Sequence, residues 1–239
     1  MLSVVLGKVA TVFEEFDEVL ALKASSKSAR DDGDWEGAIG DLEEAVDLLR
    51  GCAPDSLTRL PSRLASELAD TYGLIGGVQK RWGLLLDGED RQRHLKESIA
   101  AYDKGFGYEK DLAPGDASTY NRTNRLVGRV LLDPHVLQGD RGARMDDELR
   151  EAEETLTEQL KSVRRKDPWG YSDLGTIRLL RGSADALSVY DDLDRLRPPA
   201  FVYESTLATL EPLSEVASAL RPGLIQAVAQ LRRSARFVE

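Results

Sequence analysis

Residues 33–46 decide the fold, and they read Gly33-Asp34-Trp35-Glu36-Gly37-Ala38-Ile39-Gly40-Asp41-Leu42-Glu43-Glu44-Ala45-Val46. The apolar residues of this stretch recur one helical turn apart, so they share one face of a helix that begins after Gly33 and Asp34. Ala38 and Ala45 are small enough to let a neighbouring helix approach, while larger residues fill the space between the helices. The stretch therefore predicts the second helix of a packed helical hairpin.

The same pattern recurs twice more along the chain. Leu95, Ser98-Ile99, Tyr102 and Gly105-Phe106 form the second copy, and Gly182, Ala184, Ala186-Leu187, Tyr190 and Leu193 form the third. Trp169, Leu174-Gly175 and Leu179 precede the third copy and resemble the first helix of such a unit. The copies are irregularly spaced, and they resemble tetratricopeptide units, which stack into solenoids. We expect an all-α, tetratricopeptide-like helical-hairpin solenoid with degenerate repeats.

Helical periodicity extends along almost the whole chain, and helix breakers separate the periodic segments. The spacing predicts helices over 3–28, 35–50, 56–84, 90–110, 117–133, 145–165, 168–181, 184–196, 200–217 and 221–236. We expect one α-solenoid domain over residues 1–239. The longest gap, 134–144, contains Pro134, Gly139 and Gly142. We expect it to be a flexible or cleavable loop that could separate sub-arrays 1–133 and 145–239.

Composition argues against several classes of function. The 239 residues include 42 acidic and 32 basic side chains, a formal net charge of −10, which disfavours nucleic acid and membranes as partners. One cysteine excludes an internal disulfide framework, and two histidines leave little for metal or acid–base chemistry. No segment has the pattern of a targeting peptide or a membrane span. We expect a cytoplasmic protein with no metal and no cofactor.

Catalytic motifs are missing from the sequence. It contains no Gly-x-Ser-x-Gly elbow, no phosphate-binding Gly-Lys-Ser/Thr loop, no dinucleotide Gly-x-Gly-x-x-Gly and no kinase signature. We therefore expect a non-enzymatic protein.

Three stretches carry a closer resemblance. They are Glu67–Gly73 (ELADTYG) followed by Lys80, then Leu95–Phe106 (LKESIAAYDKGF) followed by Tyr120–Leu126 (YNRTNRL), and finally Arg197–Leu207 (RPPAFVYESTL). In this order they resemble the tetratricopeptide-type central regulatory (TRAF-binding) region of apoptosis signal-regulating MAP kinase kinase kinases and its relatives in bacterial conflict systems. The resemblance covers residues 60–215. It departs at residues 120–122, where the family pattern has Gly-Ile before its Asn.

The resemblance implies a regulatory module. In the kinases this region gates a kinase domain through partner contacts, and in the bacterial relatives it is linked to effectors and regarded as a sensor, with nucleotides as candidate ligands. Because this chain has no kinase signature, it would act in trans on a separate effector. We expect it to bind a protein partner, such as an effector, protease or toxin, in bacterial defence or stress signalling. A purely structural homo-oligomer is a further alternative.

One cluster of basic and amide residues is a candidate anion pocket. Arg122, Arg125 and Arg129 lie at i, i+3 and i+7, on one face of a helix whose start favours anions. The full candidate set is Lys80, Lys104, Asn121, Arg122, Asn124, Arg125 and Arg129. Such a pocket would suit a sensor of a nucleotide or another anionic small molecule, or a divergent nucleotide-processing domain. The alternative is a solvated face whose arginines pair with Asp103, Asp116 or Glu151.

Three further features of the sequence are open to interpretation. The basic run Lys161–Lys166 (KSVRRK) could contact nucleic acid or an acidic partner, but its place at a predicted helix C-terminus also explains the cations. The tryptophans occupy repeat-like positions and are expected in the core: Trp35, Trp82 and Trp169. The glycines of one predicted helix indicate close helix packing or a kink near a ligand: Gly73, Gly76 and Gly77.

Overall fold

The computed structural model describes residues 2–52, 60–110, 112 and 118–236, with side chains from residue 15 onward. Within these ranges the chain forms ten α-helices and one short 3-10 helix, and it contains no strand. The all-α helical-repeat fold expected from the sequence is confirmed. None of the described helices combines the length and the apolar character that a membrane span requires.

The chain divides into two compact units, Met1–Asn121 and Arg122–Glu239, which we call unit 1 and unit 2. The boundary lies inside α5. Unit 1 contains α1 (Leu2–Asp31), α2 (Trp35–Gly51), α3 (Ser62–Leu84), α4 (Gly88–Glu109) and the start of α5 (Tyr120–Leu132). The remaining elements belong to unit 2: η1 (Pro134–Leu137), α6 (Gly139–Lys161), α7 (Pro168–Arg181), α8 (Ala186–Arg195), α9 (Ala200–Ala217) and α10 (Gly223–Ala235).

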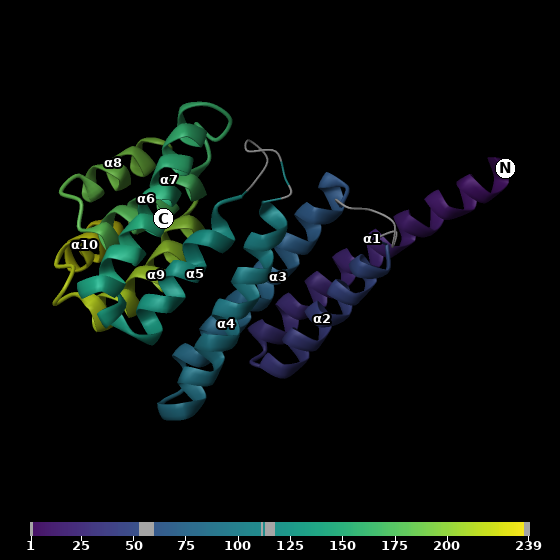
Figure 1. Cartoon of the computed structure of the whole chain (residues 1–239), viewed down its shortest axis with the longest axis horizontal. Helices are drawn as coiled ribbons and strands as arrows, with labels where there is room; N and C mark the ends of the chain where they lie inside the picture. The colour runs from purple at the N-terminus through teal and green to yellow at the C-terminus, as the bar shows by residue number, and fades with distance from the viewer. Residues whose placement is uncertain (1, 53–59, 111, 113–117, 237–239) are drawn as a thin grey trace. The chain divides into compact units, whose positions relative to one another are not determined.

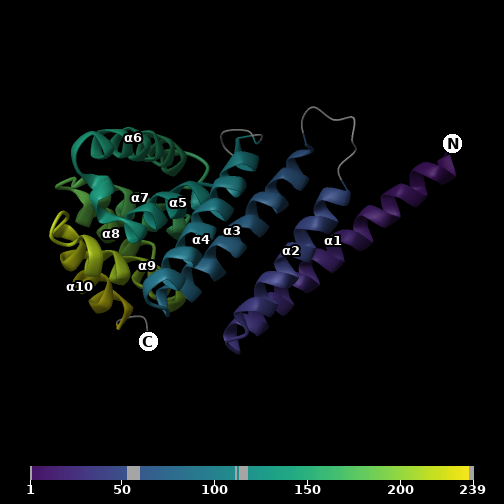
Figure 2. The same cartoon turned by 60° about the horizontal axis from the view of Figure 1, so that its bottom comes forward.

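In unit 1, α1 packs beside α2, α2 beside α3 and α3 beside α4 (Figures 1 and 2). The stretch that predicted the fold forms α2: the carboxylate of Asp34 caps the helix by accepting a 2.9 Å hydrogen bond from the Gly37 amide. The buried face of α2 includes the predicted Ala38, Leu42, Ala45 and Val46 and extends to Leu49, while the predicted Ile39 is partly buried. The Lys23 ammonium pairs with Glu67 at 2.8 Å and Asp70 at 2.7 Å, which ties α1 to α3.

A tyrosine packed on a glycine recurs in both units. Tyr102 of α4 lies so close to Gly76 of α3 that a Cβ at Gly76 would sit 2.8 Å from the tyrosine ring. Tyr190 of α8 packs on Gly175 of α7 in the same way, and a Cβ at Gly175 would lie 2.5 Å from the tyrosine ring. Both tyrosines are fully buried. The close-packing interpretation of Gly76 is therefore correct, and the two hairpins share one packing device although their sequences have diverged.

In unit 2, α7 packs against α6 and α8, and α10 packs against α9 and α8. A network of ion pairs joins α6 to α7: Arg178 contacts Glu153 at 2.7 Å, and Arg181 contacts Asp146 at 2.9 Å and Glu153 at 2.5 Å. Pairs that share partners and are partly buried hold two helices in register better than isolated surface pairs do.

The prediction of a flexible loop over residues 134–144 is wrong. Pro134 begins the 3-10 helix, whose Val136 and Leu137 are buried, and α6 starts at Gly139 rather than at 145. Gly139 takes a φ of +56°, and a Cβ at Gly142 would lie 2.8 Å from the backbone of Leu137. The glycines in this stretch therefore serve a tight turn into a helix. The boundary between the units falls within α5 and not in 134–144.

Candidate functional site

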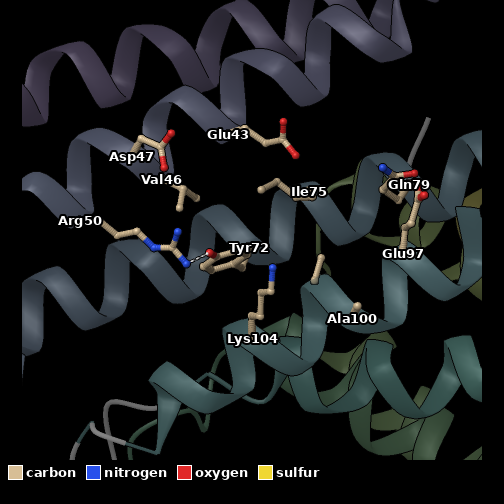
Figure 3. A pocket seen from close by; sticks show the side chains of 11 residues that line it. Glu43, Val46, Asp47, Arg50, Tyr72, Ile75, Gln79, Glu97, Ala100 and Lys104 are labelled. Carbon is tan, nitrogen blue, oxygen red and sulfur yellow. Dashed lines mark hydrogen bonds between the residues drawn. The ribbon is translucent and has the colours of Figure 1, made fainter.

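A groove of about 510 Å³ opens between three helices of unit 1 (Figure 3). Its lining comes from Glu43, Val46, Asp47 and Arg50 of α2, from Tyr72, Ile75 and Gln79 of α3, and from Glu97, Ala100, Ala101 and Lys104 of α4. The volume lies within the range of small-molecule and peptide-anchor sites in proteins. We refer to this feature as the α2–α4 groove.

One part of the α2–α4 groove is cationic and aromatic. The Arg50 guanidinium donates a 2.6 Å hydrogen bond to the Tyr72 hydroxyl, and the Lys104 ammonium lies 5.5 Å from the centre of the same ring. Tyr72 also stacks on Tyr108, with ring centres 5.8 Å apart and planes 11° from parallel. Figure 3 shows Arg50 and Lys104 approaching Tyr72 from different helices. Two cations thus flank one tyrosine, in a place where an anionic group can dock.

The local electrostatics keep this part of the groove cationic. Burial opposes charge on Arg50, but the hydroxyls of Tyr108 and Tyr72 and the carboxylate of Asp47 outweigh it, so the pKa of Arg50 is raised. Burial raises the pKa of the Tyr72 hydroxyl, while Arg50 partly opposes the change. Both effects keep arginine charged and tyrosine neutral at physiological pH.

The rest of the α2–α4 groove carries acidic side chains. Glu43 and Asp47 stand on α2 and Glu97 stands on α4. Behind Glu97, the buried His94 ring contacts the Gln79 side chain through Nδ1 at 2.6 Å. Burial, followed by the charge of Arg93, lowers the pKa of His94, so the ring is neutral above about pH 6.5. The groove therefore offers both signs of charge to a ligand.

The predicted anion-pocket residues of unit 1 have separate positions. Lys104 lines the α2–α4 groove, whereas Lys80 is buried on α3 and does not line it. Asn121 is also buried, and its side-chain amide donates to the Ala69 carbonyl at 2.9 Å and to Glu109 at 2.8 Å. The same side chain fills the space over Gly105, where a Cβ would lie 2.7 Å away. These contacts explain why Asn121 is buried: its side chain packs between α3 and α4.

The predicted residues of unit 2 lie on α5, and the arginines face α6. Arg125 and Arg129 each contact Glu148 at 2.6 Å, and Arg122 contacts Glu151 at 2.8 Å. Asn124 is buried. Glu151 is one of the partners named by the solvated-face interpretation, and Glu148 is a partner that the sequence did not indicate. The pair with Glu151 agrees with the alternative interpretation, but the side chains of Arg122, Arg125 and Arg129 are only 12%, 17% and 31% exposed, so they do not form a solvated face. A pocket built from all seven residues stays a prediction.

Sequence reasoning missed most of the α2–α4 groove. Arg50, Tyr72 and Gln79 were not candidates, although Tyr72 belongs to the ELADTYG stretch and Arg50 directly follows the last buried residue of α2. The available signal was a polar or charged residue at the edge of an apolar face on each of three consecutive helices. Such residues meet when the helices stack as successive repeats.

Two observations bear on metal binding and on thiol chemistry. The described residues hold no group of three or more histidine, cysteine or acidic side chains that could bind a metal ion. Burial and the neighbouring Glu15 carboxylate raise the pKa of the Cys52 thiol to about 11, so this thiol is protonated and a poor nucleophile at neutral pH.

The comparison with known families adds the decisive observation. A family model described as Tetratricopeptide Repeats-Sensor (TPR-S) matches residues 11–131, about half of the chain. The chain belongs to this family. The TPR-S match contains all of the α2–α4 groove and ends within α5, so the stretch at 197–207 lies outside it. No curated protein and no solved structure is significantly similar to the chain.

Membership of the TPR-S family confirms a tetratricopeptide-like sensor region with a regulatory or interaction role. Repeat domains of this type generally bind rather than catalyse. The finer resemblance to the TRAF-binding region of the kinases, and the link to bacterial conflict systems, stay predictions.

Proposed function

We propose that this TPR-S protein is a non-enzymatic regulator that binds a protein partner in the α2–α4 groove and thereby controls a separately encoded effector. The observation that carries the proposal is the groove itself, whose lining combines apolar side chains with cations at one part and carboxylates at another. Stacked helical hairpins commonly capture an extended or helical segment on such a surface.

The charges define the segment that fits. An acidic side chain or a terminal carboxylate would reach Arg50 and Lys104, and a basic side chain would reach Glu43, Asp47 or Glu97. An apolar residue between them would contact Val46 and Ile75. The overall charge of −10 favours partners with basic segments during encounter. The resemblance to conflict-system proteins supports an effector, protease or toxin as the partner, in the cytoplasm of a bacterium.

Affinity capture from the native host, with charge-reversal variants, tests this function. Lys104→Glu places a carboxylate in the cationic part of the α2–α4 groove and should abolish capture of the partner. Lys96→Glu is the matched control, because Lys96 is exposed on the same helix but does not line the groove. Loss of the partner from both variants, or from neither, contradicts the proposal.

A second candidate function is the sensing of a nucleotide or another anionic small molecule. The observation in its favour is the pair of cations around Tyr72, Arg50 and Lys104, which suit a phosphate or another anionic group. A thermal-shift screen with nucleotides and cyclic oligonucleotides tests it. A shift that Lys104→Gln removes and Arg122→Ala/Arg125→Ala retains supports sensing in the groove. The reverse pattern supports the pocket predicted on α5, and no shift in the wild type rejects both.

The structural homo-oligomer remains a third proposal. Light scattering on the purified chain tests it directly, and a monomer at micromolar concentration rejects it.

A further inference from the structure

An exposed aromatic pair lies in unit 2, outside the residues that the TPR-S family model matches. Trp169 is 40% exposed and Phe201 is 57% exposed, and their ring centres are 6.0 Å apart. Trp169 stands at the start of α7 and Phe201 at the start of α9. The expectation that Trp169 belongs to the core is therefore wrong, whereas Trp35 packs against the core of unit 1 and Trp82 covers the buried His94 ring.

The turn before Trp169 carries the basic run that the sequence singled out. Val163 is 66% exposed, and Arg165 and Lys166 are also exposed. Of the seven large apolar side chains that stand exposed in the described part of the chain, three lie in this turn or the aromatic pair: Val163, Trp169 and Phe201. We call Val163, Arg165, Lys166, Trp169 and Phe201 the aromatic–basic surface.

The turn that presents these residues is held by its own contacts. The Asp167 carboxylate accepts hydrogen bonds from the Arg164 guanidinium at 2.7 Å and from the Trp169 amide at 3.0 Å. The Tyr171 hydroxyl donates to the Arg165 carbonyl at 3.2 Å. Arg164 is thus paired within unit 2. Arg165 and Lys166 are exposed on a turn that these hydrogen bonds hold in place. A surface held in advance loses little entropy when it binds.

Helix-dipole matching does not explain these two cations. The last residue of α6 is Lys161, so Arg165 and Lys166 lie beyond the helix end and past its final turn. Across the described ranges, neither of them has a carboxylate within ion-pair distance. In a protein with a net charge of −10, two exposed cations in the turn that leads to Trp169 form a local reversal of charge.

We propose that the aromatic–basic surface binds an acidic peptide segment of a protein partner, with an apolar side chain of that segment between Trp169 and Phe201. Aromatic and arginine residues in the same patch are typical of binding hot spots. Charge complementarity selects the occupant, because carboxylates of the segment would pair with Arg165 and Lys166. The net charge disfavours nucleic acid, whose long run of phosphates needs a larger basic surface. This site is independent of the α2–α4 groove.

Selection from a display library of random 12-residue peptides tests the proposal. The full-length chain is the bait, and the variant Phe201→Ala/Lys166→Glu serves for counter-selection. We expect the enriched peptides to combine aspartate or glutamate with leucine or an aromatic residue. In fluorescence anisotropy at low salt, Phe201→Ala and Lys166→Glu should each weaken the selected peptide about tenfold, as expected for the loss of a hot-spot contact.

Matched controls separate this surface from general effects. Ile225→Ala removes a side chain of unit 2 that is also 57% exposed, and Arg233→Glu reverses an exposed charge on the same helix, α10. Both should leave the affinity unchanged, and so should Lys104→Glu in the α2–α4 groove. Four results overturn the proposal: no enrichment, enrichment of basic peptides, equal weakening by the controls, or equally tight binding of an oligo-dT of 12 nucleotides.

Discussion

Arg50 of α2 donates a 2.6 Å hydrogen bond to the hydroxyl of Tyr72 on α3, and this contact fixes the cationic part of the α2–α4 groove. The ring of Tyr72 is buried and stacked on Tyr108, whereas the Arg50 guanidinium lines the opening. The buried Tyr72 therefore fixes the position of the exposed Arg50 charge. The arrangement makes the packing of three helices and the chemistry of the groove depend on the same side chain.

Two substitutions at Tyr72 separate these roles. Tyr72→Phe keeps the stacked ring and removes the acceptor of Arg50, so we expect a loss of about 1 kcal/mol in the free energy of unfolding. Tyr72→Ala also removes a ring that is 5% exposed and should cost about 3–5 kcal/mol. Urea denaturation of the two variants measures the difference. Equal losses would show that the ring is not part of the core.

Glycine packing predicts opposite results for two helix-interior positions. At Gly76 a methyl group would lie 2.8 Å from the Tyr102 ring, so Gly76→Ala should destabilise the protein by about 1–3 kcal/mol. At Gly40 of α2 nothing lies within 4 Å, and Gly40→Ala should stabilise it by roughly 0.5–1 kcal/mol through helix propensity. Thermal and urea unfolding measure whether each variant is more or less stable than the wild type. Stabilisation by both variants would contradict the close contact of α3 with α4.

The ion pairs between α5 and α6 predict an unequal effect of two glutamates. Glu148 contacts both Arg125 and Arg129 at 2.6 Å and is 34% exposed, whereas Glu151 is 69% exposed and its carboxylate pairs with Arg122 at 2.8 Å. Glu148→Gln should cost about 1–3 kcal/mol because it weakens two partly buried contacts. Glu151→Gln should cost at most about 1 kcal/mol. If the two variants unfold at the same urea concentration, the arginines are not held as the structure shows.

His94 predicts a pH dependence of stability. Its Nδ1 contacts Gln79 at 2.6 Å and its Nε2 lies 3.3 Å from the Arg93 guanidinium, a pattern that the neutral ring satisfies with its proton on Nδ1. Because folding lowers the pKa of His94, the unfolded chain binds this proton more readily. Stability should therefore fall as the pH drops below about 6.5, until the folded ring also titrates.

The variant His94→Gln isolates this effect. Its free energy of unfolding should be lower than that of the wild type at pH 7.5, and the gap between the two should narrow toward pH 5. Carboxylates elsewhere in the chain contribute to both curves and cancel in the difference. Parallel curves across this range would show that the histidine does not titrate differently in the folded chain.

The helices were largely predictable because their apolar stripes are regular. Residues 168–181 and 200–217 were predicted to the residue, and Ala38, Leu42, Ala45 and Val46 of the predicted stripe are buried as expected. Residues 134–144 misled the prediction because proline and glycine were interpreted as a loop, whereas they form a 3-10 turn and the start of α6. Local sequence does not distinguish a breaker between helices from a residue that begins the next one.

The candidate site was harder to predict, since its residues come from three helices. Lys104 was found because it is a cation near a recognised motif, but its neighbours Arg50 and Tyr72 depend on how α2 and α3 stack against α4. Asn121 is a different case. Its position at a helix start suggested anion binding, while the structure buries it over Gly105 with its amide bonded to Ala69. A single sequence does not show which face of a polar helix is covered.

The central claim is that a protein partner occupies the α2–α4 groove, and site-specific photo-crosslinking in the native host tests it most directly. A photoreactive phenylalanine analogue replaces Ala100, which lines the groove, or Gln92, an exposed residue of α4 outside it. We predict one discrete crosslinked protein from position 100, none from position 92, and loss of the product when Lys104→Glu is added. No product from position 100, or the same products from both positions, would contradict the account.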